Sequence, residues 1–267
     1  MSIPVALTIA GSDSGGGAGI QADLKTFHAF GVFGTSAITA VTVQNTLGVQ
    51  GVHAIPADTV RAQIHAVATD LSPLACKTGM LATAELVRVV ADAIREHALP
   101  NFVLDPVMVS TSGDRLLAEG AQDAIMMDLM PLCTVITPNL DEASIMLGYG
   151  IVDAGDMERA ARDLGSRGAR AVLLKGGHLR GDRVIDVLYD GNTCHAFQGE
   201  RIDTRHTHGT GCTLSAAIAA GLANGDTLHE AVTAALDYVH DAIVHAPNLG
   251  RGSGPLNHFV RQSPRRG

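Results

Sequence analysis

Residues 5–30 of the chain read Val-Ala-Leu-Thr-Ile-Ala (5–10), then Gly-Ser-Asp-Ser-Gly-Gly-Gly-Ala-Gly (11–19), then Ile-Gln-Ala-Asp-Leu-Lys-Thr-Phe-His-Ala-Phe (20–30). The first segment is a continuous apolar run of strand length, which is typical of a strand buried on both faces of a parallel sheet. The third segment has apolar residues at helical spacing. Strand, glycine-rich loop and helix in this order predict the start of a β-α-β unit.

The same alternation continues along the chain. Further short apolar runs predict strands at Ala37–Val43, Leu74–Thr78, Phe102–Leu104, Thr134–Thr137 and Ala171–Leu174. Helical patterns fill the intervals at Ile20–Phe30, Thr59–Thr69, Ala84–His97, Ala121–Met130 and Met157–Arg167. Strands that alternate with helices predict an α/β fold, with a doubly wound, mostly parallel sheet, right-handed crossovers and helices on both faces.

The last third of the chain has a different pattern. Between Arg183 and Phe197, two short runs flank Asp190-Gly191, and this dipeptide between such runs predicts a β-hairpin. Two helices, Gly211–Ala223 and Leu228–His245, are predicted to close the chain. Because the sequence shows no linker or repeat, we expect residues 1–267 to form a single domain with 260–267 as a loose tail.

The composition excludes several classes of protein. The 19 basic and 27 acidic residues give a net charge of −8, which argues against a nucleic-acid or acidic-membrane partner. No apolar run approaches the roughly 20 residues that span a bilayer, and no basic segment marks a signal peptide. The four cysteines form no Cys-x-x-Cys pair, so neither a zinc site nor a disulfide framework is indicated. We therefore expect a soluble, cytoplasmic, reduced protein.

Unusual residues collect where the predicted strands end. The loops that follow the successive strands contain Gly11–Gly19, Gln44 and Asn45, Gly79 and Met80, Asp105-Pro106, Pro138–Glu142, and Lys175–His178. In open α/β sheets, ligands bind beyond the carboxyl ends of the strands. These loops therefore predict a ligand site at that edge of the sheet.

The most informative of these segments is His-Thr-His-Gly-Thr-Gly-Cys-Thr, residues 206–213. Its glycines lead into an apolar helix pattern, and unpaired N–H groups at a helix start attract phosphate oxygens. Cys212 would lie in the first turn, where the helix dipole favours a thiolate. The alternative is a glycine-rich loop before a core helix, with Cys212 as a small buried residue. We expect His206 and His208 to orient the loop rather than to bind a metal.

The glycine-rich loop after the first strand matches neither common nucleotide motif. With Gly15 and Gly17 as the first pair of a GxGxxG fingerprint, Ile20 occupies the last position, so NAD binding is not supported. A Walker A motif is excluded because Gly-Lys-Ser/Thr does not occur. Five glycines in nine residues favour a loop that approaches a substrate closely, with a flexible strand–helix turn as the alternative.

Two further segments permit a functional and a structural interpretation. Asn139 can cap a helix, and acidic residues in a first turn complement its dipole. Alternatively, Asn139 and Glu142 lie on one helix face and serve magnesium and nucleotide phosphate. Lys175 ends a buried strand, where a lone lysine is costly unless it is paired, and a phosphate would be such a partner.

Taken together, these segments resemble the ribokinase superfamily, and within it the hydroxymethylpyrimidine/phosphomethylpyrimidine kinases of thiamine biosynthesis. The matching stretches, in order over nearly the whole chain, are 6–26, 42–46, 77–81, 105–109, 136–142, 174–178 and 206–213. The resemblance implies a three-layer α/β/α kinase that uses ATP and Mg²⁺. It implies phosphorylation of 4-amino-5-hydroxymethyl-2-methylpyrimidine, then of its monophosphate to the diphosphate, and a homodimer. The partner would be this small pyrimidine, with no nucleic acid and no membrane.

The resemblance also implies roles for individual residues. Gln44 would bind the aminopyrimidine, in a pocket that is also lined by Gly11, Ala18, Asp23, Met80 and Val107. Lys175 would neutralise the transferring phosphoryl group, and Asn139 and Thr210 would contact nucleotide. Gly209, Gly211 and Cys212 would form a catalytic anion hole, while Glu142 and Asp105 would hold magnesium through water. The chain departs from the pattern at Ser110-Thr111-Ser112-Gly113, where relatives often have a lysine.

Three rival functions remain open at this stage. A pyridoxine or pyridoxal kinase shares the fold and a hydroxymethylated nitrogen heterocycle, although Gln44 and Met80 favour the pyrimidine. A non-catalytic sensor of the pyrimidine would need no phosphate-binding residues such as Lys175. A nicotinamide oxidoreductase is disfavoured by the failed dinucleotide fingerprint.

Overall fold

The computed structural model describes residues 3–108, 117–177 and 183–260. Its main sheet has the strand order β10-β9-β8-β7-β6-β5-β1-β2. β9 pairs antiparallel with both β8 and β10, and the other neighbouring strands of this sheet pair in parallel. The strands are β1 (Val5–Ala10), β2 (Phe33–Ile38), β5 (Ala75–Thr78), β6 (Phe102–Leu104), β7 (Val135–Ile136), β8 (Val172–Leu174), β9 (Arg183–Tyr189) and β10 (Cys194–Glu200).

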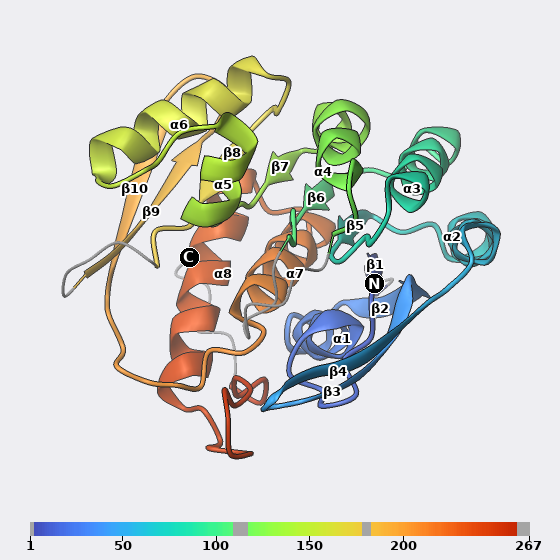
Figure 1. The fold of residues 1–267 in the computed structure, drawn as a ribbon, viewed down its shortest axis with the longest axis horizontal. Helices are drawn as coiled ribbons and strands as arrows, with labels where there is room; N and C mark the ends of the chain where they lie inside the picture. Colours follow the sequence, from blue (N-terminus) through green and yellow to red (C-terminus); the bar gives the residue numbers. More distant parts are fainter. Residues whose placement is uncertain (1–2, 109–116, 178–182, 261–267) are drawn as a thin grey trace.

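Helices cover both faces of this sheet, so the fold has three layers (Figure 1). The helices are α1 (Gly19–Ala29), α2 (Ala57–Leu71), α3 (Ala84–Glu96), α4 (Ala121–Ala124), α5 (Leu140–Leu147), α6 (Ala154–Ser166), α7 (Thr210–Ala223) and α8 (Leu228–Val244). One core lies between the sheet and α1, α7 and α8, and the other between the sheet and α2 to α6. Almost all of α7 is buried, as expected for a helix that is apolar on every side. The predicted α/β/α architecture is confirmed.

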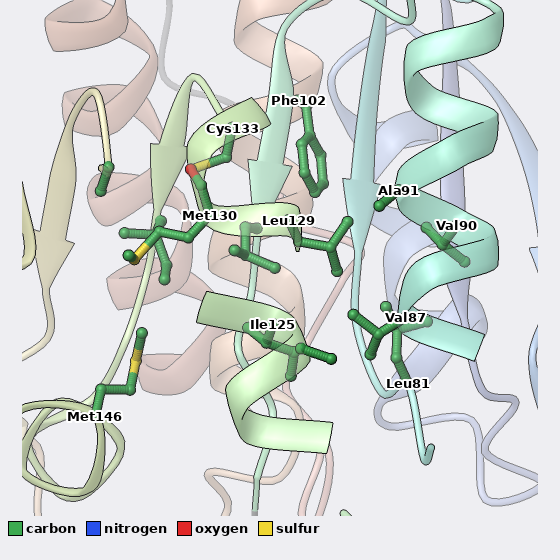
Figure 2. Packing of buried hydrophobic residues seen from close by; sticks show 14 of the residues in the cluster. Leu81, Val87, Val90, Ala91, Phe102, Ile125, Leu129, Met130, Cys133 and Met146 are labelled. Atoms are coloured by element: carbon green, nitrogen blue, oxygen red, sulfur yellow. The ribbon is translucent and has the colours of Figure 1, made fainter. Parts of the chain in front are cut away.

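Figure 2 shows the second core, where α3 packs over β6 and the segment after α4. The predicted helix Ala121–Met130 begins at the predicted residue but does not continue as an α-helix. It passes into a π-helical turn, Ile125–Leu129, and then a 3₁₀ turn, Met130–Leu132. Pro131 lies in the last turn and has no N–H to continue a helical hydrogen-bond ladder.

The predicted hairpin is also confirmed. Tyr189 and Cys194 face each other across the antiparallel pair β9–β10. The Asp190 carboxylate accepts hydrogen bonds from the N–H groups of Asn192 and Thr193 at 2.9 and 2.8 Å, which closes the turn.

The prediction of one strand at Ala37–Val43 is wrong, because two strands meet there. β2 ends at Ile38, and β3 (Ala40–Asn45) pairs with β4 (Gly48–Ala54) in a separate two-stranded ribbon. Thr39 lies between β2 and β3: its N–H donates to Ala10 O, and its carbonyl accepts from Ile55 N, each at 3.0 Å. Residues of β3 alternate between buried and exposed, which is the pattern of a strand covered on one face. The chain therefore passes from one sheet to another within a single apolar run.

Three features of the sequence lie outside the described residues: the segment Ser110–Gly113, His178 and the tail 261–267. In the part of the chain that the structure describes, no helix combines the length and apolarity needed to cross a bilayer.

Candidate active site

A cavity of about 1270 Å³ lies at the carboxyl ends of the parallel strands. Loops after β1, β5, β6, β7 and β8 contribute to its wall, together with β3, β10, α7 and α8. The expected site residues that line it are Gly11, Ala18, Gln44, Met80, Asp105, Val107, Asn139, Glu142, Lys175, Gly209, Thr210, Gly211 and Cys212. The loops therefore gather at one edge, as the topology of a doubly wound sheet requires. Gln44 reaches this cavity from the ribbon and not, as predicted, from a loop of the main sheet.

The expectation that Asp23 lines the pocket is corrected by the structure. Asp23 is completely buried in α1 and is absent from the cavity wall. Its carboxylate accepts hydrogen bonds from Lys77 Nζ at 2.8 and 2.9 Å and from Thr8 Oγ1 at 2.6 Å. Burial opposes the charge on Lys77, but Asp23 outweighs it and raises the pKa of the lysine. Asp23 is therefore the counter-ion of a buried lysine beneath the site.

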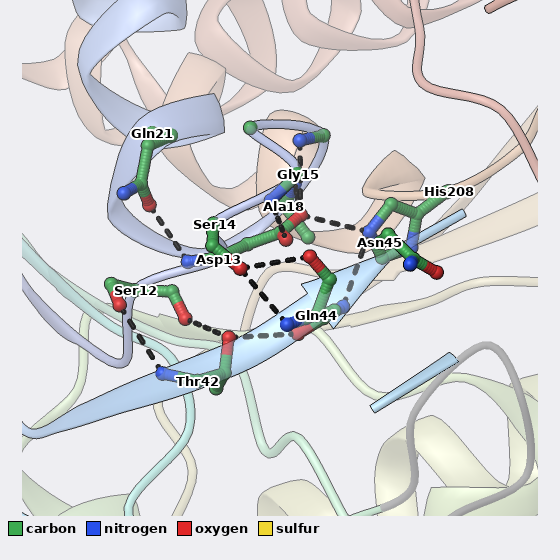
Figure 3. Close-up of polar contacts among 12 residues, drawn as sticks. Ser12, Asp13, Ser14, Gly15, Ala18, Gln21, Thr42, Gln44, Asn45 and His208 are labelled. Carbon is green, nitrogen blue, oxygen red and sulfur yellow. Dashed lines mark hydrogen bonds and ion pairs between the residues drawn. The ribbon is translucent and has the colours of Figure 1, made fainter. Parts of the chain in front are cut away.

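Asp13 organises the glycine-rich loop (Figure 3). Its carboxylate accepts hydrogen bonds from the N–H groups of Gly15, Gly17 and Ala18 at 2.8, 2.9 and 2.8 Å. The same carboxylate contacts His208 Nε2 at 2.9 Å. Asp13 thus joins the loop after β1 to the segment before α7, and the prediction that His208 orients its loop is confirmed.

Two glycines allow these loops to touch backbone against backbone. Gly19 has φ +56° and Gly209 has φ +86°, a conformation that residues with a Cβ rarely adopt. A Cβ at Gly19 would overlap the carbonyl of Gly11, and a Cβ at Gly209 would overlap that of Gly17. Larger residues at either position would push the loops apart.

The first turn of α7 has the chemistry of an anion site. Gly209 is its N-cap, and the amide groups of Gly211 and Cys212 have no hydrogen-bond acceptor among the described residues. Lys175 Nζ lies 3.3 Å from the position that a Cβ on Gly211 would occupy. Free N–H groups, the helix dipole and an ammonium group together favour phosphate oxygens at this point.

Two carboxylates flank Lys175. Its Nζ lies 3.4 Å from Asp105 Oδ1, and Asp105 is almost fully buried. Burial opposes the charge on Lys175, but Asp105 and Glu142 outweigh this effect and raise the pKa of the lysine. The lysine is therefore cationic. Lys175 N also donates to Pro138 O at 2.9 Å, so the ends of β7 and β8 bring it beside Asn139.

Comparison with known proteins identifies the family of this chain. A family model described as phosphomethylpyrimidine kinase matches residues 13–257. The chain belongs to this family. A hydroxymethylpyrimidine/phosphomethylpyrimidine kinase from Rhizobium meliloti strain 1021 is 53% identical over 260 residues, which cover 96% of this chain and 97% of that protein.

Solved structures confirm the ribokinase-like fold of this phosphomethylpyrimidine kinase family member. Bacillus subtilis pyridoxal kinase, in an ADP complex, has a TM-score of 0.90 and 43% identity, with 96% of this chain and 98% of that chain covered. Phosphomethylpyrimidine kinase from Clostridium difficile 630 has a TM-score of 0.81 and 41% identity, with 90% and 99% covered. Both activities printed in these names therefore occur on closely similar folds.

In this family member, Asn139 and Glu142 form a capping box at the start of α5. Asn139 Oδ1 accepts from Glu142 N, and Glu142 Oε2 accepts from Asn139 N, each at 2.8 Å. Both residues also line the cavity, so the structural role does not exclude a functional one. Burial, which Lys175 opposes and Asp105 reinforces, raises the pKa of Glu142 to about 7.

Glu142→Gln is expected to remove a pH dependence of stability from the ligand-free protein. Because the pKa rises from 4.5 to about 7 on folding, the folded state binds this proton more tightly, and the stability it contributes is lost as pH rises through 7. Between about pH 5.5 and 8, the wild type should lose about 2 kcal/mol relative to the variant. Glutamine can keep the capping box. Urea unfolding of the wild type and the variant at both pH values measures the effect. If the two proteins differ in free energy of unfolding by the same amount at both pH values, the prediction is contradicted.

The protonation state of Cys212 differs from the expectation of a stabilised thiolate. Burial raises the pKa of the thiol to about 11, although Lys77 acts in the opposite direction. The nearby Asp23 and Asp105 carboxylates disfavour a second negative charge. Desolvation and these charges outweigh the helix dipole, so Cys212 is a neutral thiol near pH 7.

Sequence reasoning missed Lys77, although a signal for it was present. The chain has 3 lysines against 16 arginines, and the lysines are Lys25, Lys77 and Lys175. Lys25 Nζ donates to Gly16 O at 2.7 Å, Lys77 lies beneath the cavity and Lys175 lies on its wall. All three therefore lie at the cavity or support the glycine-rich loop that forms part of its wall.

Other cavity residues carried no signal in the sequence. Asp186 of β9 accepts a hydrogen bond from Gly176 N at 2.8 Å and holds the loop that follows Lys175. Phe197 of β10 and Asp237 and His240 of α8 also line the cavity. These residues come from strands and helices with ordinary patterns, so only the packing of the elements reveals them.

Proposed function

We propose that this chain transfers the γ-phosphoryl group of ATP to 4-amino-5-hydroxymethyl-2-methylpyrimidine, and then phosphorylates the monophosphate to the diphosphate. The single observation that carries the proposal is one cavity lined both by the amide of Gln44 and by the start of α7, which lies beside Lys175. An amide can donate to a ring nitrogen and accept from an adjacent amino group. Membership of the phosphomethylpyrimidine kinase family supports the same reaction.

In the first reaction, the hydroxymethyl oxygen bonds to the γ-phosphorus while the bond from that phosphorus to the β–γ bridging oxygen breaks. ADP leaves and the hydroxyl proton passes to water. The N–H groups of Gly211 and Cys212 and the ammonium group of Lys175 balance the charge on the transferring group. Since phosphoryl transfer through a loose transition state depends mainly on position and charge, a neutral Cys212 suffices.

Magnesium fits the acidic residues of this site. Asp105 and Glu142 are buried carboxylates beside Lys175, and hard oxygen ligands of this kind suit Mg²⁺ held partly through water. We propose that these two residues hold the ion and that Asn139 and Thr210 contact the nucleotide. When bound, Mg²⁺ neutralises charge on the β- and γ-phosphates.

A pyridoxal kinase is the alternative, because such enzymes share the fold. The amide of Gln44 favours the aminopyrimidine, which offers an acceptor and a donor on adjacent atoms. Release of ADP with Mg²⁺–ATP should be compared for hydroxymethylpyrimidine, its monophosphate and pyridoxine. Turnover of both pyrimidines supports the proposal; turnover of pyridoxine without reaction of the monophosphate would refute it.

Cys212→Asp is expected to harm the second phosphorylation more than the first. In the second reaction the nucleophile is an anionic phosphate oxygen, which a fixed carboxylate repels and a neutral thiol does not. Single-turnover rates of the two steps measure the effect, with Cys212→Ser as the uncharged control. Equal losses in both steps would overturn the idea.

We propose that the chain is a single domain that forms a homodimer through the β3–β4 ribbon. Val41 and Val43 alternate along β3 with buried Thr42, and they are 46% and 59% exposed. Paired apolar side chains on an uncovered ribbon face favour a partner. Val43→Lys should shift the mass in light scattering from twice 27.7 kDa towards one chain. Exposed Val152 supplies the control, Val152→Lys, and a wild-type monomer would contradict the proposal.

A further inference from the structure

A polar cluster surrounds the side chain of Gln44, which is the group proposed to bind the ring (Figure 3). Its Nε2 lies 3.3 Å from His208 Nε2, and its Oε1 lies 3.2 Å from Thr42 Oγ1. An amide exchanges its oxygen and nitrogen by a half-turn of the terminal torsion, so the hydrogen-bonding needs of its neighbours decide the orientation.

The first neighbour, His208, carries a hydrogen on Nε2. That nitrogen lies 2.9 Å from Asp13 Oδ2. Burial raises the pKa of Asp13, but hydrogen bonds from His208 and Ala18 outweigh it and lower the pKa overall. Asp13 is therefore an ionised acceptor, and a bare imidazole nitrogen facing it would be repelled. Both the neutral Nε2–H tautomer and the imidazolium satisfy this contact, and in either state Nε2 is a donor.

The second neighbour, Thr42, has already used its hydroxyl hydrogen. Thr42 Oγ1 lies 2.8 Å from the carbonyl oxygen of Ser12, which can only accept. Two oxygen atoms lie this close only when a hydrogen bond joins them, so the hydroxyl hydrogen of Thr42 points at the Ser12 carbonyl. Thr42 Oγ1 can therefore only accept from Gln44.

We propose that His208 and Thr42 are positioning residues that hold the Gln44 amide with its oxygen towards His208 and its NH₂ towards Thr42. The His208 N–H is then shared between the Asp13 carboxylate and the amide oxygen. The amide nitrogen donates one hydrogen to Thr42 Oγ1. The opposite orientation would set two donors against each other at His208 and two acceptors against each other at Thr42.

This orientation has a consequence for the substrate, which rests on the function proposed above. The second hydrogen of the amide pairs with the ring nitrogen on the Thr42 side, and the amide oxygen accepts from the exocyclic amino group on the His208 side. The reactive hydroxymethyl group is attached to the carbon next to the amino-bearing carbon. It therefore also lies on the His208 side, and His208 is followed directly by the anion site at Gly209–Cys212. A reversed amide would turn the reactive group away.

The test compares two ring patterns. The 4-oxo analogue of the hydroxymethylpyrimidine offers a ring N–H donor beside a carbonyl acceptor, the reverse of the amino compound. A fixed amide should reject it, so we expect the wild type to prefer the amino compound by at least ~10²-fold in kcat/KM. Thr42→Val frees the amide to turn and should reduce this preference at least tenfold. Thr42→Ser keeps the hydroxyl and should restore it.

Further measurements separate positioning from folding and from the function itself. His208→Ala should also reduce the preference, and KM for ATP should stay unchanged in Thr42→Val and Thr42→Ser. A raised KM with an unchanged preference in Thr42→Val would show a merely structural role and overturn the proposal. Nitrogen-15 NMR of the His208 ring requires no substrate, and an unprotonated Nε2 would also overturn it. Failure of the proposed function would instead appear as absence of ADP release with the amino compound in the wild type.

Discussion

Lys77→Met is expected to lower the free energy of unfolding by about 3–5 kcal/mol. Lys77 and Asp23 are both completely buried, and their atoms meet at 2.8 and 2.9 Å. Removal of the ammonium group leaves the carboxylate buried with Thr8 as its remaining hydrogen-bond partner among the residues described. An uncompensated buried charge is costly because no water replaces the lost partner. Urea unfolding followed by circular dichroism measures the loss, since the chain has no tryptophan.

Two variants control for this result. The double variant Lys77→Met/Asp23→Leu removes both charges and should recover most of the stability, because a buried ion pair is often replaceable by apolar residues. Arg61→Met breaks an exposed pair with Glu96 and should cost less than about 1 kcal/mol. A loss below about 1 kcal/mol for Lys77→Met would show that the buried pair does not support the fold beneath the site.

Lys175→Met is expected to reduce kcat by about 10³-fold, with a much smaller change in KM for the pyrimidine. The ammonium group lies beside Gly211 at the anion site, whereas Gln44 belongs to the separate ribbon. In the proposed reaction the lysine would act on the transferring phosphoryl group, where charge neutralisation supports the transition state. Pre-steady-state ADP formation at saturating Mg²⁺–ATP measures the effect on the chemical step.

Lys175→Arg is the control for charge at this position. It keeps the cation but replaces a compact ammonium with a planar guanidinium, so we expect a loss smaller than that of Lys175→Met. Circular dichroism checks that both variants fold when the contact of Lys175 with Asp105 is removed or altered. A kcat for Lys175→Met within tenfold of the wild type would refute the assigned role.

Lys77 and Lys175 have the same side chain, but their surroundings differ and so do their expected roles. Lys77 is fully buried, and its charge is matched by Asp23. Lys175 is partly exposed to the cavity, and it lies beside Asp105 with room for an anion. We therefore expect loss of Lys77 to affect chiefly stability and loss of Lys175 to affect chiefly the reaction.

Local patterns were sufficient to predict much of the architecture. β1 and β6 have the predicted bounds, and β9–β10 turn at Asp190-Gly191 as predicted. Apolar runs and turn residues act over a few positions, so their effect is visible in sequence. The prediction of one strand at Ala37–Val43 was wrong because the hydrophobic pattern does not distinguish two cases. One buried strand and two half-buried strands that pair with different partners give the same apolar run.

The sequence by itself predicted most of the alternating strands and helices, the glycine-rich loops at the carboxyl edge, and the helix start at Gly209–Cys212 where we propose an anion site. The tertiary structure alone decided the partner of Asp23, which lies 54 positions from Lys77, and the contact of Asp13 with His208, 195 positions away. It also decided that Cys212 is a neutral thiol. Protonation and ion pairing depend on burial and on charges from distant segments. These two factors produce no periodic pattern in the sequence, so they could not be predicted from it.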